Sequence, residues 1–189
     1  ARGLANLPAE VNELLKELDT LGKRFGGLHG AAGALPAGGG LNVRLAVLGI
    51  IFKSKGLPES LPQAQFSLWL KKAGIYDKAR KSVEAAGKEF LKELNDLYVS
   101  PLIAKALLAA DPNFAADEKK AREALRAQFP RRDTLTDDEF IRLIREVLEE
   151  GGRLPCTLLV LDEVQLYIGG DQQRSYDVQM VAEAICKQL

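Results

Sequence analysis

The spacing of apolar and polar positions along the chain predicts a mainly helical protein with a small α/β part. Apolar residues recur three and four positions apart over most of the sequence, which is the period of an amphipathic helix. The expected helices cover residues 8–23, 42–55, 62–73, 76–99, 101–110, 116–129, 137–150 and 172–189. Because strand patterns are almost absent between residues 42 and 152, we expect this stretch to form a helical lobe or insertion.

One segment departs from the helical period. Residues 157–161 are all apolar or β-branched, a pattern typical of a strand buried on both faces of a parallel sheet. The strand ends in two carboxylates, Asp162 and Glu163. This is the position at which open α/β sheets bind their ligands. Since a buried strand needs neighbours, we expect part of its sheet to lie outside this chain.

An apolar strand followed by Asp-Glu is typical of the Walker B element of P-loop NTPases. There the Asp holds Mg²⁺, directly or through water, and a Glu beside the hydrated ion can polarise the attacking water. Carboxylate oxygens suit this ion, which keeps several of its waters. Asp162 is therefore a candidate for metal and nucleotide binding, Glu163 a candidate catalytic residue, and Gln165 a candidate for positioning the nucleotide. The alternative is a core strand whose carboxylates only cap the next turn, with Gln165 as a polar loop residue.

Eight glycines fall between residues 22 and 40, and this segment is predicted to be a loop. It does not satisfy the requirements of a Walker A element, which needs Gly-x-x-x-x-Gly-Lys-Ser/Thr between a strand and a helix. Gly22-Lys23 is followed by Arg24, and the predicted element before it is a helix. The single histidine, His29, is expected to be solvent-exposed in this loop rather than a ligand.

The composition, with 47% hydrophobic and 28% charged residues, is that of a globular protein. Lys plus Arg equals Asp plus Glu at 26 each, so the chain has no global basic field for nucleic acid. A local cluster of Lys71, Lys72 and residues 78–81 could face DNA, but carboxylates follow it closely and a solvated surface is expected. No apolar run approaches the ~20 residues of a membrane span. Cys156 and Cys186 match no metal-site spacing and are expected to be reduced core thiols.

Several segments, taken in order, carry a resemblance to one protein family. The Walker B segment, residues 154–169, reads LPCTLLVLDEVQLYIG. The other segments are residues 43–52, 68–70, 74–76, 97–101, 174–179 and 183–189. Together they resemble the large P-loop ATPase of BREX phage-resistance systems (the BrxC/PglY type), over most of the chain from about residue 42 onward.

The resemblance implies a multi-domain, AAA+-like, cytoplasmic ATPase that uses ATP and Mg²⁺ in an antiviral complex. In it Asp162 would be the Mg²⁺-associated carboxylate and Glu163 the water-polarising one. The implied partners are other defence-system proteins and, as further candidates, DNA or a second copy of the protein, but no membrane. The family's Walker A element would precede residue 1, so this chain alone is expected to hold half of a nucleotide site and to be inactive.

These expectations divide the chain into three parts. Residues 1–41 are assigned to the NTPase core as a helix and glycine-rich loop, residues 42–152 to the helical lobe, and residues 153–189 to the core as the Walker B strand, a loop and a helix. The alternative is a helical module for protein–protein or DNA interaction with a degenerate NTPase core, in which Asp162 and Glu163 are architectural.

Overall fold

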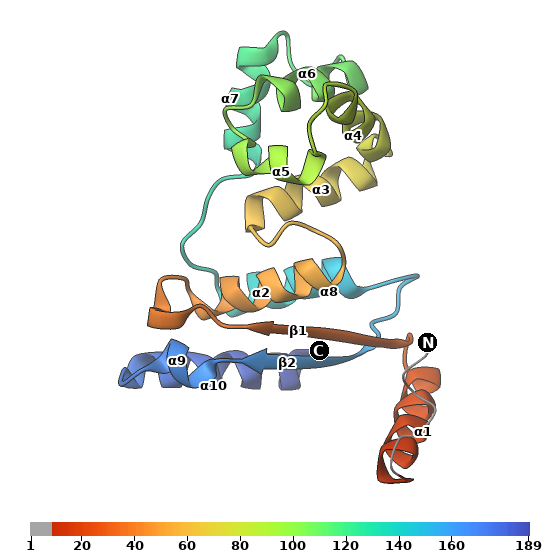
Figure 1. Cartoon of the computed structure of the whole chain (residues 1–189), viewed down its shortest axis with the longest axis vertical. Helices are drawn as coiled ribbons and strands as arrows, with labels where there is room; N and C mark the ends of the chain where they lie inside the picture. Colours follow the sequence, from red (N-terminus) through yellow and green to blue (C-terminus); the bar gives the residue numbers. More distant parts are fainter. Residues whose placement is uncertain (1–8) are drawn as a thin grey trace. The chain divides into compact units, whose positions relative to one another are not determined.

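The computed structural model describes residues 9–189 and divides them into two compact units (Figure 1). Unit 1 holds the described residues up to Gly39 together with Asp137–Leu189, and unit 2 holds Gly40–Thr136. The described chain is mainly helical and contains one two-stranded parallel sheet. This confirms the predicted class of a mainly α protein with a small α/β part.

Unit 1 is built around the sheet. Its elements are helix α1 (Ala9–Arg24), strand β1 (Leu28–Ala34), the 3-10 turn η1 (Ala37–Gly39), α8 (Asp137–Leu148), β2 (Cys156–Asp162), α9 (Val164–Ile168) and α10 (Gln172–Gln188). The strands pair in parallel from Leu28 opposite Cys156 to Ala34 opposite Asp162. Helix α10 packs on α8 and on α9, and it lies behind β2 in Figure 1.

Strand β1 lies inside the segment that the sequence predicts to be a loop, so that prediction is wrong. Its sequence is Leu-His-Gly-Ala-Ala-Gly-Ala, and glycine and alanine are both depleted in strands. The backbone ladder with β2 supplies the stability that the side chains do not. His29, predicted to be exposed, is half-buried in this strand opposite Thr157.

The predicted burial of residues 157–161 on both faces is also wrong. Leu158 is 61% exposed and Val160 50% exposed, whereas Leu159 and Leu161, on the other face of β2, are half-buried. On β1 the corresponding covered position, Ala31, is 2% exposed. One face of the sheet is therefore covered and the other is open.

Unit 2 consists of short helices, several of which begin at a side-chain N-cap. They are α2 (Val43–Ser54), α3 (Leu61–Lys72), α4 (Tyr76–Ala85), α5 (Phe90–Glu93), the 3-10 turn η2 (Leu94–Asp96), α6 (Pro101–Ala110) and α7 (Glu118–Gln128). The Asn42 side chain accepts a hydrogen bond from the Arg44 amide at 3.0 Å, and the Asp117 side chain accepts one from the Lys120 amide at 2.8 Å. The single helix predicted over residues 76–99 is broken, because Gly87 adopts φ 76° after α4.

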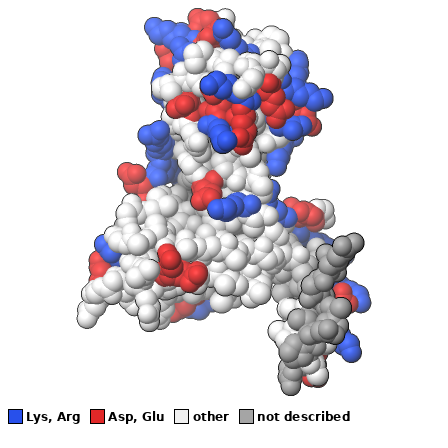
Figure 2. Space-filling model, viewed as in Figure 1, with Lys and Arg blue, Asp and Glu red and all other residues white. Residues whose placement is uncertain are grey.

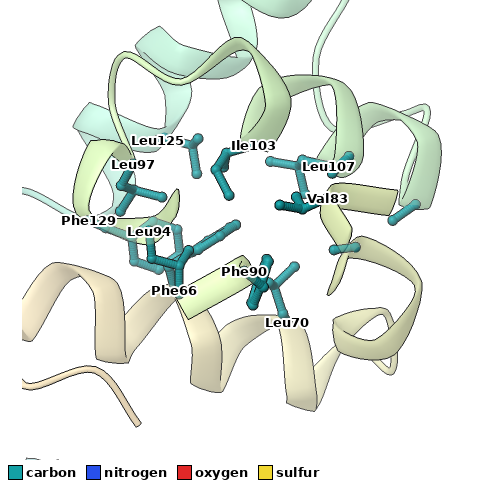
Figure 3. Packing of buried hydrophobic residues seen from close by; sticks show 13 residues of the cluster. Phe66, Leu70, Val83, Phe90, Leu94, Leu97, Ile103, Leu107, Leu125 and Phe129 are labelled. Carbon is teal, nitrogen blue, oxygen red and sulfur yellow. The ribbon is translucent and has the colours of Figure 1, made fainter. Parts of the chain in front are cut away.

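The core of unit 2 joins residues from α3 to α7 (Figure 3). Its largest members are Phe66, Leu70, Phe90, Leu94, Leu97, Ile103, Leu107, Leu125 and Phe129. The rings of Phe66 and Phe129 meet edge to face with centroids 5.6 Å apart, a favoured aromatic geometry. Each fully buried side chain of this size contributes roughly 1.5–3 kcal/mol. Unit 2 therefore has a hydrophobic core of its own.

The division of the chain differs from the sequence-based one at α8. The sequence assigns this helix to the helical lobe, whereas the structure places it in unit 1 with α10. None of the helices in the described range 9–189 combines the length and apolar character needed to cross a lipid bilayer.

Candidate functional site

The two candidate carboxylates lie where the strand β2 ends. Asp162 is its last residue and Glu163 is the residue from which α9 starts. Both side chains are exposed. They stand at the carboxyl edge of the parallel sheet, as the sequence predicts, and this is the edge at which such sheets bind ligands.

The backbone of Glu163 is strained. Its φ of 56° and ψ of 24° place it in the left-handed region, and it is the one non-glycine residue with positive φ among residues 9–189. An L-residue pays roughly 1–2 kcal/mol for this conformation, which glycine adopts freely. Strain of this kind concentrates at functional sites. A glutamate at position 163 therefore costs stability, and this cost marks the residue as a candidate for a functional role.

The Asp162 carboxylate takes part in this turn. Its Oδ1 accepts a hydrogen bond from the Glu163 backbone N–H at 2.7 Å. The same peptide region is tied to α9, because the Glu163 carbonyl accepts from the Tyr167 N–H at 3.0 Å. Tyr167 is buried and anchors the short helix. One of the two Asp162 carboxylate oxygens is therefore engaged within the turn, whereas Glu163, the N-cap residue of α9, makes no side-chain cap.

A glycine-rich turn lies beside these carboxylates. The Leu35 N–H donates to the Asp162 carbonyl at 3.0 Å, and η1 packs against α9. Gly38, within η1, has φ 76°. The sequence predicts a helix before Gly22-Lys23, and α1 confirms it. The later glycines, residues 38–40, lie instead between β1 and α2 in the chain.

The segment nevertheless lacks the cation of a Walker A element. Its glycines are followed by Leu41 and Asn42, not by Lys and Ser or Thr. The nearby Arg174 of α10 is held elsewhere, because its guanidinium donates to the Tyr167 carbonyl at 3.3 Å and pairs with Asp171 at 3.3 Å. The described edge of the sheet therefore offers carboxylates and backbone groups.

Gln165 lies in α9, two residues after Glu163, and is exposed. The structure thus brings the three predicted site residues to one edge of the sheet. A resident Mg²⁺ fits this edge, because the ion keeps most of its waters and needs only one or two carboxylates besides phosphate oxygens. Within residues 9–189, no group of three or more His, Cys, Asp or Glu side chains could hold a metal ion by itself.

The other candidates from the sequence are explained by contacts within the units. In the basic cluster, Lys78 donates to the Ala110 carbonyl at 3.3 Å, and Arg80 pairs with Asp77 at 3.1 Å. Lys and Arg are interspersed with Asp and Glu over unit 2 in Figure 2, which agrees with a solvated face. Cys156 and Cys186 are free thiols, but Cys156 is half-buried and Cys186 is exposed, so neither is the core residue predicted.

Unit 2 contains a pocket of about 420 Å³ that the sequence did not indicate. Arg131 lines it with its guanidinium 5.5 Å from the centre of the Tyr98 ring. Two carboxylates, Glu59 and Asp133, line the same pocket together with Arg131 and Arg132. The formal charges of these four side chains balance.

Comparison of the chain with protein-family models, with curated proteins and with solved structures finds no match. The assignment of function therefore depends on the residues and their geometry.

Proposed function

We propose that unit 1 supplies the Walker B carboxylates of an ATP-hydrolysing P-loop protein with an AAA+-like core. The observation that carries the proposal is the strained turn at Glu163. An exposed glutamate in the left-handed conformation follows an exposed aspartate at the carboxyl end of a parallel strand. A purely structural turn at this position favours glycine, whereas a catalytic glutamate has a reason to be there.

The two carboxylates take different roles in this proposal. Asp162 Oδ1 is engaged by the Glu163 N–H, which fixes the carboxylate, and the other carboxylate oxygen would hold hydrated Mg²⁺. Bound Mg²⁺ would neutralise phosphate charge at this edge. Glu163 accepts a proton from the attacking water, a contribution worth about 10²–10⁴ in rate. Gln165 helps to position the nucleotide.

The remaining parts of the proposal come from the family resemblance. They are a cytoplasmic location, a role in phage defence and partners among other defence proteins, with DNA as a further candidate. Because the glycine turn after β1 lacks Lys and Ser or Thr, the Walker A element is supplied by other residues of the protein. The chain alone is then expected to bind ATP weakly.

A second candidate function is a protein-interaction module in which the carboxylates are architectural. The hydrogen bond from the Glu163 N–H to Asp162 favours it, since a capping aspartate needs no ligand to explain it. In this second candidate Glu163 takes no part in catalysis. This difference from the first candidate can be measured.

The test is to measure Mg·ATP binding and ATP turnover by the whole protein that contains this chain. Glu163→Gln should bind ATP and lose turnover, and Asp162→Asn should weaken the dependence of binding on Mg²⁺. Glu149→Gln is the matched control, because Glu149 is an exposed glutamate of unit 1 outside the site. Unchanged turnover in Glu163→Gln, or none in any form, would contradict the ATPase and support the interaction module.

A further inference from the structure

The sheet of unit 1 has an open apolar face. In the parallel register Leu28, Gly30 and Ala32 of β1 share one face with Leu158 and Val160 of β2. All five are exposed, and we call them the open face. Parallel sheets are normally covered on both sides. The same face continues to Ala34 and Asp162 at its carboxyl end, so its apolar part, the open face, is the part expected to be covered in solution.

Helix α1 carries an apolar surface of the same kind. Leu14, Leu15, Leu18 and Leu21 recur at helical spacing and form what we call the α1 stripe. Leu14 is 53% exposed, and Leu15 and Leu21 are exposed as well. An amphipathic helix ordinarily buries such a stripe against a core. Unit 1 thus leaves two apolar surfaces in water on consecutive elements.

We propose that α1 folds over the open face of the sheet and lies antiparallel to β1. The connection between the two elements serves as the hinge, and the Gly27 N–H, which donates to the Gly22 carbonyl at 3.1 Å, ties it to α1. Residues 25–27 join the two elements, and Gly27 adopts φ 114°, which few other residues could. At the hinge end the helix already meets the open face, since a Cβ on Gly22 would lie only 2.8 Å from Leu28 Cγ.

The dimensions of the two elements match. Sixteen helical residues span about 24 Å, and the seven residues of each strand span about 23 Å. Folding back from the hinge brings Leu21 to the level of Leu28 and Leu14 to the level of Ala32 and Val160. The small side chains of β1 leave a shallow channel beside Leu158 and Val160 that the α1 stripe fills.

A second copy of the chain fits the open face less well. Two strands of this length, about 4.8 Å apart, present roughly 230 Å². A stable interface needs about 800 Å² from each partner, so this surface is too small to hold a dimer by itself. A tethered helix avoids the cost of association, which makes α1 the better occupant.

The closed arrangement has a consequence for the carboxylate edge. A helix antiparallel to β1 points its amino-terminal end toward the carboxyl end of the sheet, where Asp162 lies. The positive end of the helix dipole would then face this edge. The closure depends only on the two apolar surfaces and the hinge. It does not rest on the ATPase proposal, and its tests do not involve ATP.

Disulfide trapping tests the closure. Leu14→Cys and Val160→Cys are introduced together after Cys156 and Cys186 are replaced by serine. A disulfide requires the two Cβ atoms to approach to about 4 Å. We expect an intramolecular bond to form at least about tenfold faster than in the matched pair Lys16→Cys with Val160→Cys, because position 16 faces away from the α1 stripe. Equal rates, no intramolecular bond, or a covalent dimer would overturn the proposal.

Hydroxyl-radical labelling of the unaltered chain is a second test of the closure, and it needs no substitution. Val99 in unit 2 is 61% exposed and Val160 is 50% exposed, so an open face labels these two valines to a similar extent. Closure predicts several-fold lower labelling of Val160 than of Val99. Equal labelling would show that α1 does not cover the open face.

Discussion

Replacing Glu163 by glycine should stabilise unit 1. The left-handed conformation costs an L-residue roughly 1–2 kcal/mol, and this cost disappears in glycine. Glycine also adds conformational freedom to the unfolded chain, which costs roughly 0.5–1 kcal/mol. The expected net gain in the free energy of unfolding is about 0.5–1 kcal/mol. A glutamate therefore lowers the stability of the turn that it occupies.

The comparison that isolates the backbone effect is Glu163→Gly against Glu163→Ala. Alanine removes the glutamate side chain but keeps the Cβ that causes the strain, so any difference between the two variants comes from the conformation. The control pair is Glu146→Ala and Glu146→Gly, at an exposed position within α8 of the same unit. There glycine should be less stable than alanine by about 1 kcal/mol. The two positions should give opposite signs.

Hydrogen exchange of the β2 amides that bond to β1 measures the difference in the free energy of unfolding of unit 1 between the two variants. A gain of about 0.5–1 kcal/mol slows their exchange roughly two- to fivefold. If Glu163→Gly exchanges as fast as Glu163→Ala, or faster, the turn is not strained. The structural reason for assigning chemistry to Glu163 would then be lost.

Two further predictions concern one unit each. In unit 1, Gly26→Ala should lower stability by about 1–3 kcal/mol, because the new Cβ would lie 2.8 Å from Arg153 Cβ, whereas Gly170→Ala, with nothing within 4 Å, should be neutral or stabilising in the same urea titration. In unit 2, the Tyr98 hydroxyl donates to the Phe129 carbonyl, so Tyr98→Phe should cost about 0.5–1.5 kcal/mol at neutral pH. Burial raises the pKa of Tyr98 above its usual 10.0, opposed by Arg131, so its contribution is complete below pH 10.0 and is lost as the pH rises beyond it. Thermal melts should therefore show a shallower alkaline loss of stability for Tyr98→Phe, and identical slopes would contradict this cause.

The parts of the fold that were predictable depend on local chemistry. Asn42 and Asp117 cap the helices that follow them, and Pro101 occupies the first position of α6, as their residue types indicate. The break in the helix predicted over residues 76–99 was missed because a single glycine inside a helical pattern costs only about 1 kcal/mol and does not by itself predict a break. In the structure it has positive φ, and a helix cannot continue through that conformation.

Strand β1 was missed for a different reason. Its glycine and alanine residues carry no local strand signal, and the strand forms only because β2, far along the chain, provides a hydrogen-bonding partner. The same register explains what was predictable in the site. The position of Asp162 and Glu163 at the end of a strand followed from sequence alone, whereas the adjacent glycine turn and the backbone of Glu163 depend on how the strands pair.

The most direct test of the central claim is ATP turnover by the whole protein carrying Glu163→Gln, measured beside Glu149→Gln. If Glu163 polarises the attacking water, turnover in Glu163→Gln falls by about 10²–10⁴ while ATP remains bound, and Glu149→Gln behaves as the unaltered protein. Equal turnover in the two variants would contradict the account and leave Asp162 and Glu163 as the cap of a turn.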